Sequence, residues 1–158
     1  MGYKKISFLR MSIFSIGFIV LIMCAFWLPT VARKAAVMNP EYAYLRFPVL
    51  FALYITAIPF FIALYQSLKL LNSIKKDNAF SKLAVNSLGN IKNCALIIIV
   101  LYVLGMLTLA MLNALHPGLA VMGTVIVFAT LVIILFTMLL QQLLKNAISL
   151  KSENELTV

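Results

Sequence analysis

Four long apolar runs, separated by short polar stretches, dominate the pattern of the chain. The runs cover residues 11–31, 47–74, 93–115 and 119–148. Each is long enough to cross a hydrocarbon core of about 30 Å as an α-helix, which rises about 1.5 Å per residue. The pattern therefore predicts an all-α fold, an integral membrane four-helix bundle that forms a single transmembrane domain over residues 1–158.

The most strongly charged interruption lies in the middle of the chain, at Lys75 to Lys82. Residues 75–92 are predicted to form the loop between the second and third spans. Ser81 is a good N-cap for a helix that starts at Lys82, and Phe80 can fold back onto its first turn as a hydrophobic staple. No proline follows before the next apolar run, so one helix is expected to start in this loop and continue as the third span.

The stretch between the first two spans carries turn and interface signals. Trp27 and Pro29 are expected to mark the outer end of the first helix, and Arg33 to Arg46 is expected to be a loop. The tyrosines of this loop suit either interfacial anchors or a lip that recognises a ligand. A basic start before an apolar run also fits a signal peptide, but this run exceeds a signal core, which favours an uncleaved span.

Composition supports a location in the membrane. The chain is 64% hydrophobic and 11% charged, and a soluble core of 158 residues could not bury so many apolar side chains. A net charge of +9 would raise the question of nucleic acid in a soluble domain. Because cytoplasmic loops of membrane proteins carry excess Lys and Arg, we expect a lipid bilayer and no direct nucleic acid as partner.

The basic residues are divided unequally between the two sides of the predicted membrane. Three lie with the outer loop: Arg33, Lys34 and Arg46. Ten lie on the opposite side: Lys4, Lys5, Arg10, Lys69, Lys75, Lys76, Lys82, Lys92, Lys145 and Lys151. The positive-inside rule then places both termini, the loop 75–92 and the tail 149–158 in the cytoplasm of a multi-pass bacterial inner-membrane protein.

The second to fourth helices are longer than a membrane requires, so helices 2 to 4 are predicted to extend into the cytoplasm. Their projecting ends would form a short bundle, which either packs on itself or docks a cytoplasmic protein. The turn before the fourth helix is assigned to His116-Pro117-Gly118.

The residues that could carry chemistry are few. None of the four carboxylates lies within a predicted span, and the single histidine, His116, sits in a turn without partners. Cys24 and Cys94 fall at different membrane heights, which excludes a disulfide within the chain. Threonines within the spans are expected to join helices more often than to line a path. We expect no enzyme activity, no metal and no cofactor.

Two stretches carry a resemblance to a known family: Phe80-Ser81 with residues 88–92, and the tail 150–158 with its Glu-Asn-Glu-Leu-Thr sequence. With four spans of these lengths, the chain resembles the bacterial membrane family called domain of unknown function 2975. Members of that family are expected to be encoded beside a small helix-turn-helix regulator. The resemblance implies candidate partner-binding residues at Phe80, Ser81, Glu153, Asn154, Glu155 and Leu156.

The resulting hypothesis is a membrane protein that binds or regulates a cytoplasmic partner, such as a small helix-turn-helix transcription factor. The alternative is a small transporter, channel or immunity-type membrane protein. A homo-oligomer is left open in either case.

Overall fold

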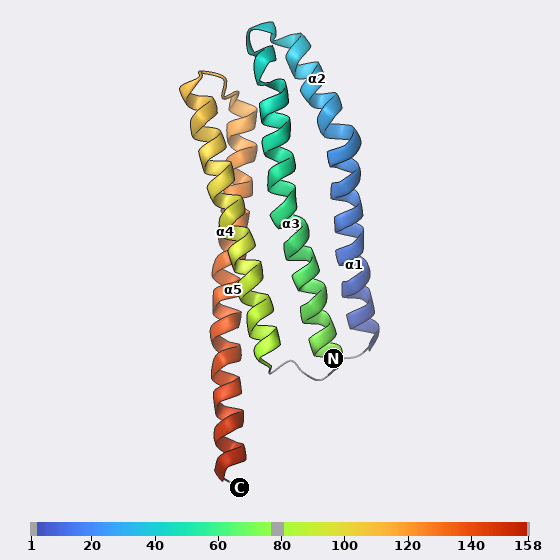
Figure 1. Ribbon diagram of the computed structural model, residues 1–158, viewed down its shortest axis with the longest axis vertical. Coiled ribbons are helices and arrows are strands. Elements are labelled where there is room, and N and C mark those ends of the chain that lie inside the picture. The colour runs from blue at the N-terminus through green and yellow to red at the C-terminus, as the bar shows by residue number, and fades with distance from the viewer. Residues whose placement is uncertain (1–2, 77–80, 158) are drawn as a thin grey trace.

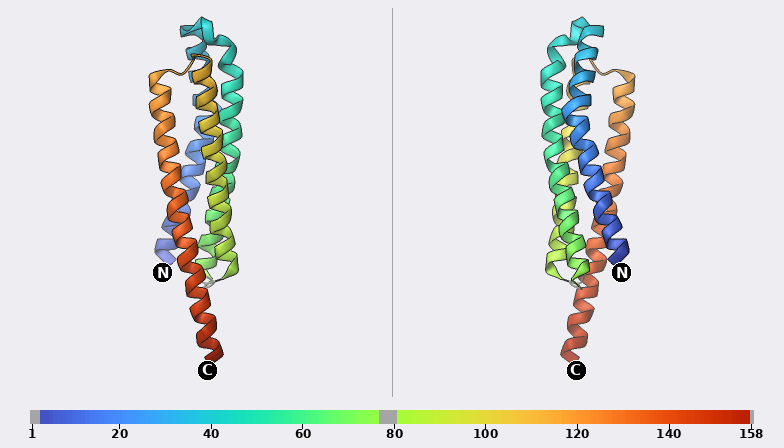
Figure 2. Two further views of the ribbon diagram at one scale, coloured as in Figure 1. Left: turned by 90° about the vertical axis from the view of Figure 1, so that its left-hand side faces the viewer. Right: turned by 90° about the vertical axis from the view of Figure 1, so that its right-hand side faces the viewer.

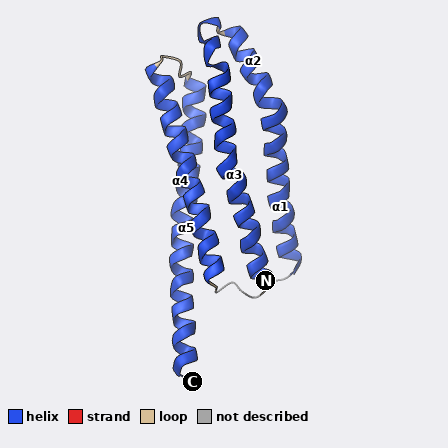
Figure 3. Ribbon diagram, viewed as in Figure 1, coloured by secondary structure: helices blue, strands red, loops and turns tan. Residues whose placement is uncertain are grey.

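The computed structural model describes residues 3–76 and 81–157, and the regular elements within these ranges are all helical (Figure 3). The elements are α1 (Tyr3–Ile22), the π-helical η1 (Met23–Trp27), α2 (Leu28–Met38), the 3-10 helix η2 (Pro40–Leu45), α3 (Arg46–Lys75), α4 (Lys82–Met111) and α5 (Pro117–Thr157). Because α1, η1 and α2 follow one another without a break, the chain forms four long rods (Figure 1). The predicted all-α four-helix architecture is confirmed.

Each rod is long and apolar enough to cross a membrane. The four candidate spans are Lys4–Met38, Pro40–Lys75, Lys82–Met111 and Pro117–Leu156. In their most apolar stretches, only 0% to 17% of the residues are buried inside the protein. Most apolar side chains therefore face outward, which is stable only where lipid surrounds them.

The rods pack in the spatial order α1, α3, α4, α5. α3 packs along α4, α4 along α5 and α1 along α3, whereas α1 and α5 are not a packed pair. Figure 2 shows from two sides that all four rods run along one common axis. The turns at residues 39–45 and 112–116 lie at one end of the assembly, called here the hairpin end (Figure 1). The start of α1, the end of α3 and the start of α4 lie at the opposite end, called the basic end.

α5 is the rod that leaves the assembly. It has 41 residues, about 60 Å of helix, and Figure 1 shows it running past the basic end of the other rods. α3 and α4 have 30 residues each, about 45 Å, which exceeds a hydrocarbon core of about 30 Å. The end of α3 and the start of α4 lie close to the level at which α1 begins (Figure 1). All three helices are thus longer than the core requires, as predicted, and α5 extends furthest at the basic end (Figure 1).

The first rod differs from the prediction, because Pro29 does not end it. η1 widens the helix just before the proline, with the Leu28 N–H bonded to the Met23 carbonyl, and Pro29 then stands in the first turn of α2. Because Pro29 has no N–H, it cannot bond to a carbonyl of the preceding turn, and the widened turn makes room for its ring within a continuous helix. The helix runs on to Met38. The prediction of a loop from Arg33 to Arg46 was therefore wrong, because this segment is almost entirely helical.

The widened turn is tied to its neighbour. The Tyr54 hydroxyl on α3 donates to the Cys24 carbonyl at 2.8 Å, and the Thr30 hydroxyl donates to the Phe26 carbonyl at 2.8 Å. A π-turn and a proline disturb the regular ladder of backbone hydrogen bonds, and hydroxyl groups here supply donors to its carbonyls. The irregular turn of the first rod is thus also the place where a hydrogen bond joins this rod to α3.

The turn into α5 is made earlier than expected. Asn113 has a φ of 56°, the left-handed conformation that reverses the chain after α4. α5 starts at Pro117, and the His116 Nδ1 accepts a hydrogen bond from the Gly118 N–H at 3.0 Å. His116 therefore acts as a helix N-cap, a structural role.

Close packing is concentrated from the middle of the rods to the basic end. The buried side chains there are Ile6 on α1, Leu71 and Ser73 on α3, Ala84, Ser87, Leu88, Cys94 and Ala95 on α4, and Thr130, Ile134 and Thr137 on α5. Many of them are small, which lets the helix backbones approach one another. The basic end is therefore the more closely packed part of the bundle.

Candidate interaction surface

Ser81 stands at the start of α4, at the basic end. Its hydroxyl oxygen accepts a hydrogen bond from the Ala84 N–H at 3.3 Å, so it caps the helix that starts at Lys82, as predicted. Phe80, the other predicted contact residue of this stretch, and its staple lie outside the described residues. The Ser81 side chain therefore has a structural use in addition to any contact with a partner.

The remaining predicted contact residues lie in the last turns of α5. Glu153, Asn154, Glu155 and Leu156 belong to residues 149–157, which we call the α5 extension. Every residue of this extension from 149 to 156 is exposed, and Leu156 is 83% exposed. The sequence had been interpreted there only as a polar tail. A signal for the helix was available, because no glycine or proline follows Gly123.

Gln141 shows where α5 leaves the bundle. Its side-chain amide donates to the Val85 carbonyl in the first turns of α4 at 3.2 Å. Because α4 and α5 are antiparallel, Ser81 is level with about residue 145 of α5, and Glu153 lies on the order of 12 Å further along the helix axis. The structure thus places both predicted stretches at the basic end but does not bring them together into one patch.

Two contacts at the basic end were missed in the sequence. The Arg10 guanidinium donates to Asn72 Oδ1 and so joins α1 to α3. The Lys69 ammonium lies 5.3 Å from the centroid of the Tyr65 ring. Polar residues at the ends of apolar runs are a general sign of such contacts, but a single sequence does not say which two meet. Arg10 therefore serves to join α1 to α3.

The polar residues inside the spans behave differently from the expectation that they join helices. The hydroxyls of Thr108, Thr130 and Thr137 each donate to the carbonyl four residues earlier in their own helix, at 2.6 to 2.8 Å. Thr130 and Thr137 are buried and Thr108 is exposed. Their hydrogen bonds therefore satisfy their own helices, and Thr130 and Thr137 contribute to helix contact through shape.

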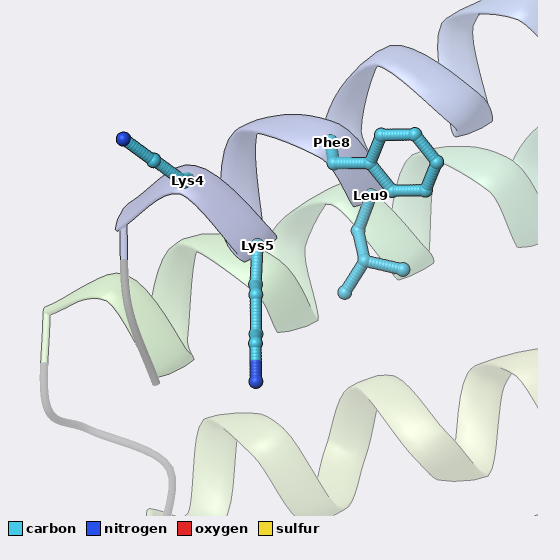
Figure 4. A pocket seen from close by; sticks show the side chains of 4 residues that line it. All are labelled: Lys4, Lys5, Phe8 and Leu9. Atoms are coloured by element: carbon cyan, nitrogen blue, oxygen red, sulfur yellow. The ribbon is translucent and has the colours of Figure 1, made fainter.

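An open hollow lies beside the first turns of α1. It is lined by Lys4, Lys5, Phe8 and Leu9, with the Lys5 and Leu9 side chains on one side of the helix (Figure 4). Within residues 3–76 and 81–157, no three His, Cys, Asp or Glu side chains are grouped so that they could hold a metal ion. Cys24 and Cys94 are both free thiols, which confirms that they form no disulfide with each other.

Four apolar rods with little buried surface, both turns at one end and a basic opposite end define a multi-pass α-helical membrane protein. The chain belongs to the family described as protein of unknown function (DUF2975), which it matches over residues 30–158. It is also 46% identical, over the full length of both chains, to a Bacillus subtilis (strain 168) protein called uncharacterized membrane protein YoaS. No solved structure matches the chain. The resemblance found in the sequence is confirmed.

Proposed function

We propose that this chain is a cell-membrane protein that holds the α5 extension in the cytoplasm as a docking site for a cytoplasmic protein. The sidedness is supported by charge. Of the thirteen Lys and Arg residues, only Arg33, Lys34 and Arg46 belong to the elements at the hairpin end. The positive-inside rule favours the basic end, and with it both termini, on the cytoplasmic side.

The observation that carries the proposal is the α5 extension itself. A helix that continues past its own bundle leaves both faces open, and Leu150 is 62% exposed while Leu156 is 83% exposed. Glu153 and Glu155 stand between these leucines and give the extension two carboxylates. A projecting helix with apolar and acidic side chains suits a protein partner that supplies an apolar contact within a basic surface.

The partner class comes from the family resemblance, which implies a small helix-turn-helix regulator. The surface of such a protein that meets DNA is basic because it neutralises phosphates. Glu153 and Glu155 complement that charge, so binding to the extension would compete with binding to DNA. In this proposal, the membrane protein controls how much regulator is free to reach DNA.

The sidedness is tested with single cysteines. Cys24 and Cys94 are replaced by alanine, and cysteine is introduced at Val37, which is 73% exposed near the hairpin end, or at Ser152 in the extension. A membrane-impermeant maleimide added to intact spheroplasts should label the protein with Val37→Cys and not the protein with Ser152→Cys. Labelling of Ser152→Cys without lysis contradicts the orientation.

Partner binding is tested by photo-crosslinking in cells. A photoreactive residue replaces Leu156 or, as a control of equal exposure, Met111 at the hairpin end; these side chains are 83% and 84% exposed. The expected product, specific to position 156, contains a small DNA-binding protein. It should weaken in the Glu153→Lys/Glu155→Lys variant and not in Glu41→Lys. Identical products from both positions, or solute flux through the purified protein in proteoliposomes, would support the transporter or channel alternative.

A further inference from the structure

The first turns of α1 expose two stacked pairs of side chains. Ile6 is 4% exposed and Arg10 is bonded to Asn72, so the pair at positions 6 and 10 faces the bundle. Residues four positions apart lie above one another on a helix. The pairs Lys4 with Phe8 and Lys5 with Leu9 therefore lie on other sides of the helix, and these four side chains line the hollow, with Lys4 and Lys5 extending in different directions (Figure 4).

The order of groups along this hollow matches the order of groups in a phospholipid. Lys4 and Lys5 stand at the basic end of the rod, and Phe8 and Leu9 stand one turn, about 6 Å, deeper in the apolar span. Phe8 is 71% exposed and Leu9 is 39% exposed, so both have surface that a lipid can contact. Cations at the level of the headgroups above apolar side chains at the level of the acyl chains are complementary to one lipid molecule.

The charge of the two lysines is not neutralised from within the described chain. Neither Lys4 nor Lys5 has an ion-pair or hydrogen-bond partner there. Of the carboxylates in the described residues, Glu41 lies at the hairpin end and Glu153 and Glu155 lie in the α5 extension. α1 has α3 as its packed neighbour and does not pack against α5, so a lipid can reach this side of α1.

We propose that this hollow is a binding site for an anionic phospholipid. Its headgroup phosphate lies over the first turn of α1, where Lys4 and Lys5 flank it from two sides of the helix, and an acyl chain lies against Phe8 and Leu9. Lysines at the cytoplasmic end of a transmembrane helix attract anionic headgroups. The site is independent of the α5 extension, and it gives the first helix, which is the least buried of the four spans, a lipid as a second neighbour.

The test is lipid retention by the full-length protein, measured by native mass spectrometry in detergent titrated with phosphatidylglycerol or phosphatidylcholine. The wild type should retain phosphatidylglycerol preferentially. Lys4→Gln/Lys5→Gln should lower the apparent affinity for phosphatidylglycerol by about fivefold per lysine removed. The matched control Lys75→Gln/Lys76→Gln removes the same charge at the same end of the bundle but outside the hollow, and it should lose less.

A second pair of variants tests the apolar part of the site. Phe8→Ser should weaken retention of phosphatidylglycerol, whereas Phe14→Ser, on the same helix, 61% exposed and outside the hollow, should not. Soluble glycerol phosphate should fail to displace the lipid. Equal retention of both lipids by the wild type, equal losses in the two double lysine variants, or displacement by glycerol phosphate would overturn the proposal. Helix content by circular dichroism confirms that each variant is folded.

Discussion

The two halves of α4 have opposite surroundings, although both belong to one apolar helix. The half nearer the basic end, residues 82–95, contains five buried residues: Ala84, Ser87, Leu88, Cys94 and Ala95. The half nearer the hairpin end, residues 96–111, contains none, and Leu104 and Met111 are 57% and 84% exposed. Yet this second half is the more hydrophobic one. In lipid, hydrophobicity does not drive a helix against its neighbours, whereas small residues allow close contact.

The glycines of the bundle refine this comparison. A methyl group added at Gly89 would meet the Gln141 amide nitrogen at 3.0 Å, and one added at Gly123 would collide with the Met106 side chain. One added at Gly105 would meet nothing within 4 Å. A small residue therefore permits close approach only where a neighbouring helix has a side chain to fill the space.

The largest expected difference between the two halves comes from shortening a leucine. Leu88 is 6% exposed, and Leu88→Ala should cost about 2 kcal/mol or more, because it leaves a cavity between packed helices. Leu104→Ala should leave the stability nearly unchanged, since lipid replaces the lost contacts. Unfolding of the purified protein by sodium dodecyl sulfate in mixed micelles, followed by circular dichroism, measures both. Equal losses would show that the hairpin half is packed as closely as the basic half.

Enlarging an alanine reverses the direction of the change and should have a smaller effect. Ala84 is 0% exposed, so Ala84→Leu should cost about 1–3 kcal/mol through overpacking. Ala110→Leu, at an exposed position of the same helix, serves as the control and should be neutral. Thermal unfolding midpoints in one detergent compare the two variants. A neutral Ala84→Leu variant would mean that α4 is not held closely in the bundle.

The smallest expected effect concerns the hydrogen bond from Gln141 to the Val85 carbonyl. Gln141→Leu should cost about 0.6 kcal/mol, the average for a hydrogen bond between membrane helices. Gln142→Leu is the matched control, because the Gln142 amide bonds within its own helix, to Asn146 at 3.2 Å. The same unfolding titration measures both variants. If the two variants lose equal stability, the hydrogen bond between α4 and α5 contributes nothing specific.

The cap at the start of α4, which acts within one helix, was predicted, whereas contacts with a second helix were not. Ser81 was identified as a cap because its partner, Ala84, is three residues away. Pro29 was misinterpreted as a helix end, since the structure accommodates it with a π-turn that is braced by Tyr54 of α3. For the candidate site, the sequence indicated the residues of the α5 extension but neither its helical form nor its separation from Ser81.

The sequence alone determined that the chain is a membrane protein with four helices long and apolar enough to span a bilayer, and the distribution of its basic residues favours one orientation. Run length, proline position and charge suffice for this, because each acts through the contact of a single helix with lipid or water. Only the tertiary structure decided which helices pack together, that close packing lies toward the basic end, and that α5 runs past the other described rods. Lipid solvates all apolar faces of a helix equally well, so hydrophobicity cannot select a neighbour; shape and a few hydrogen bonds select it.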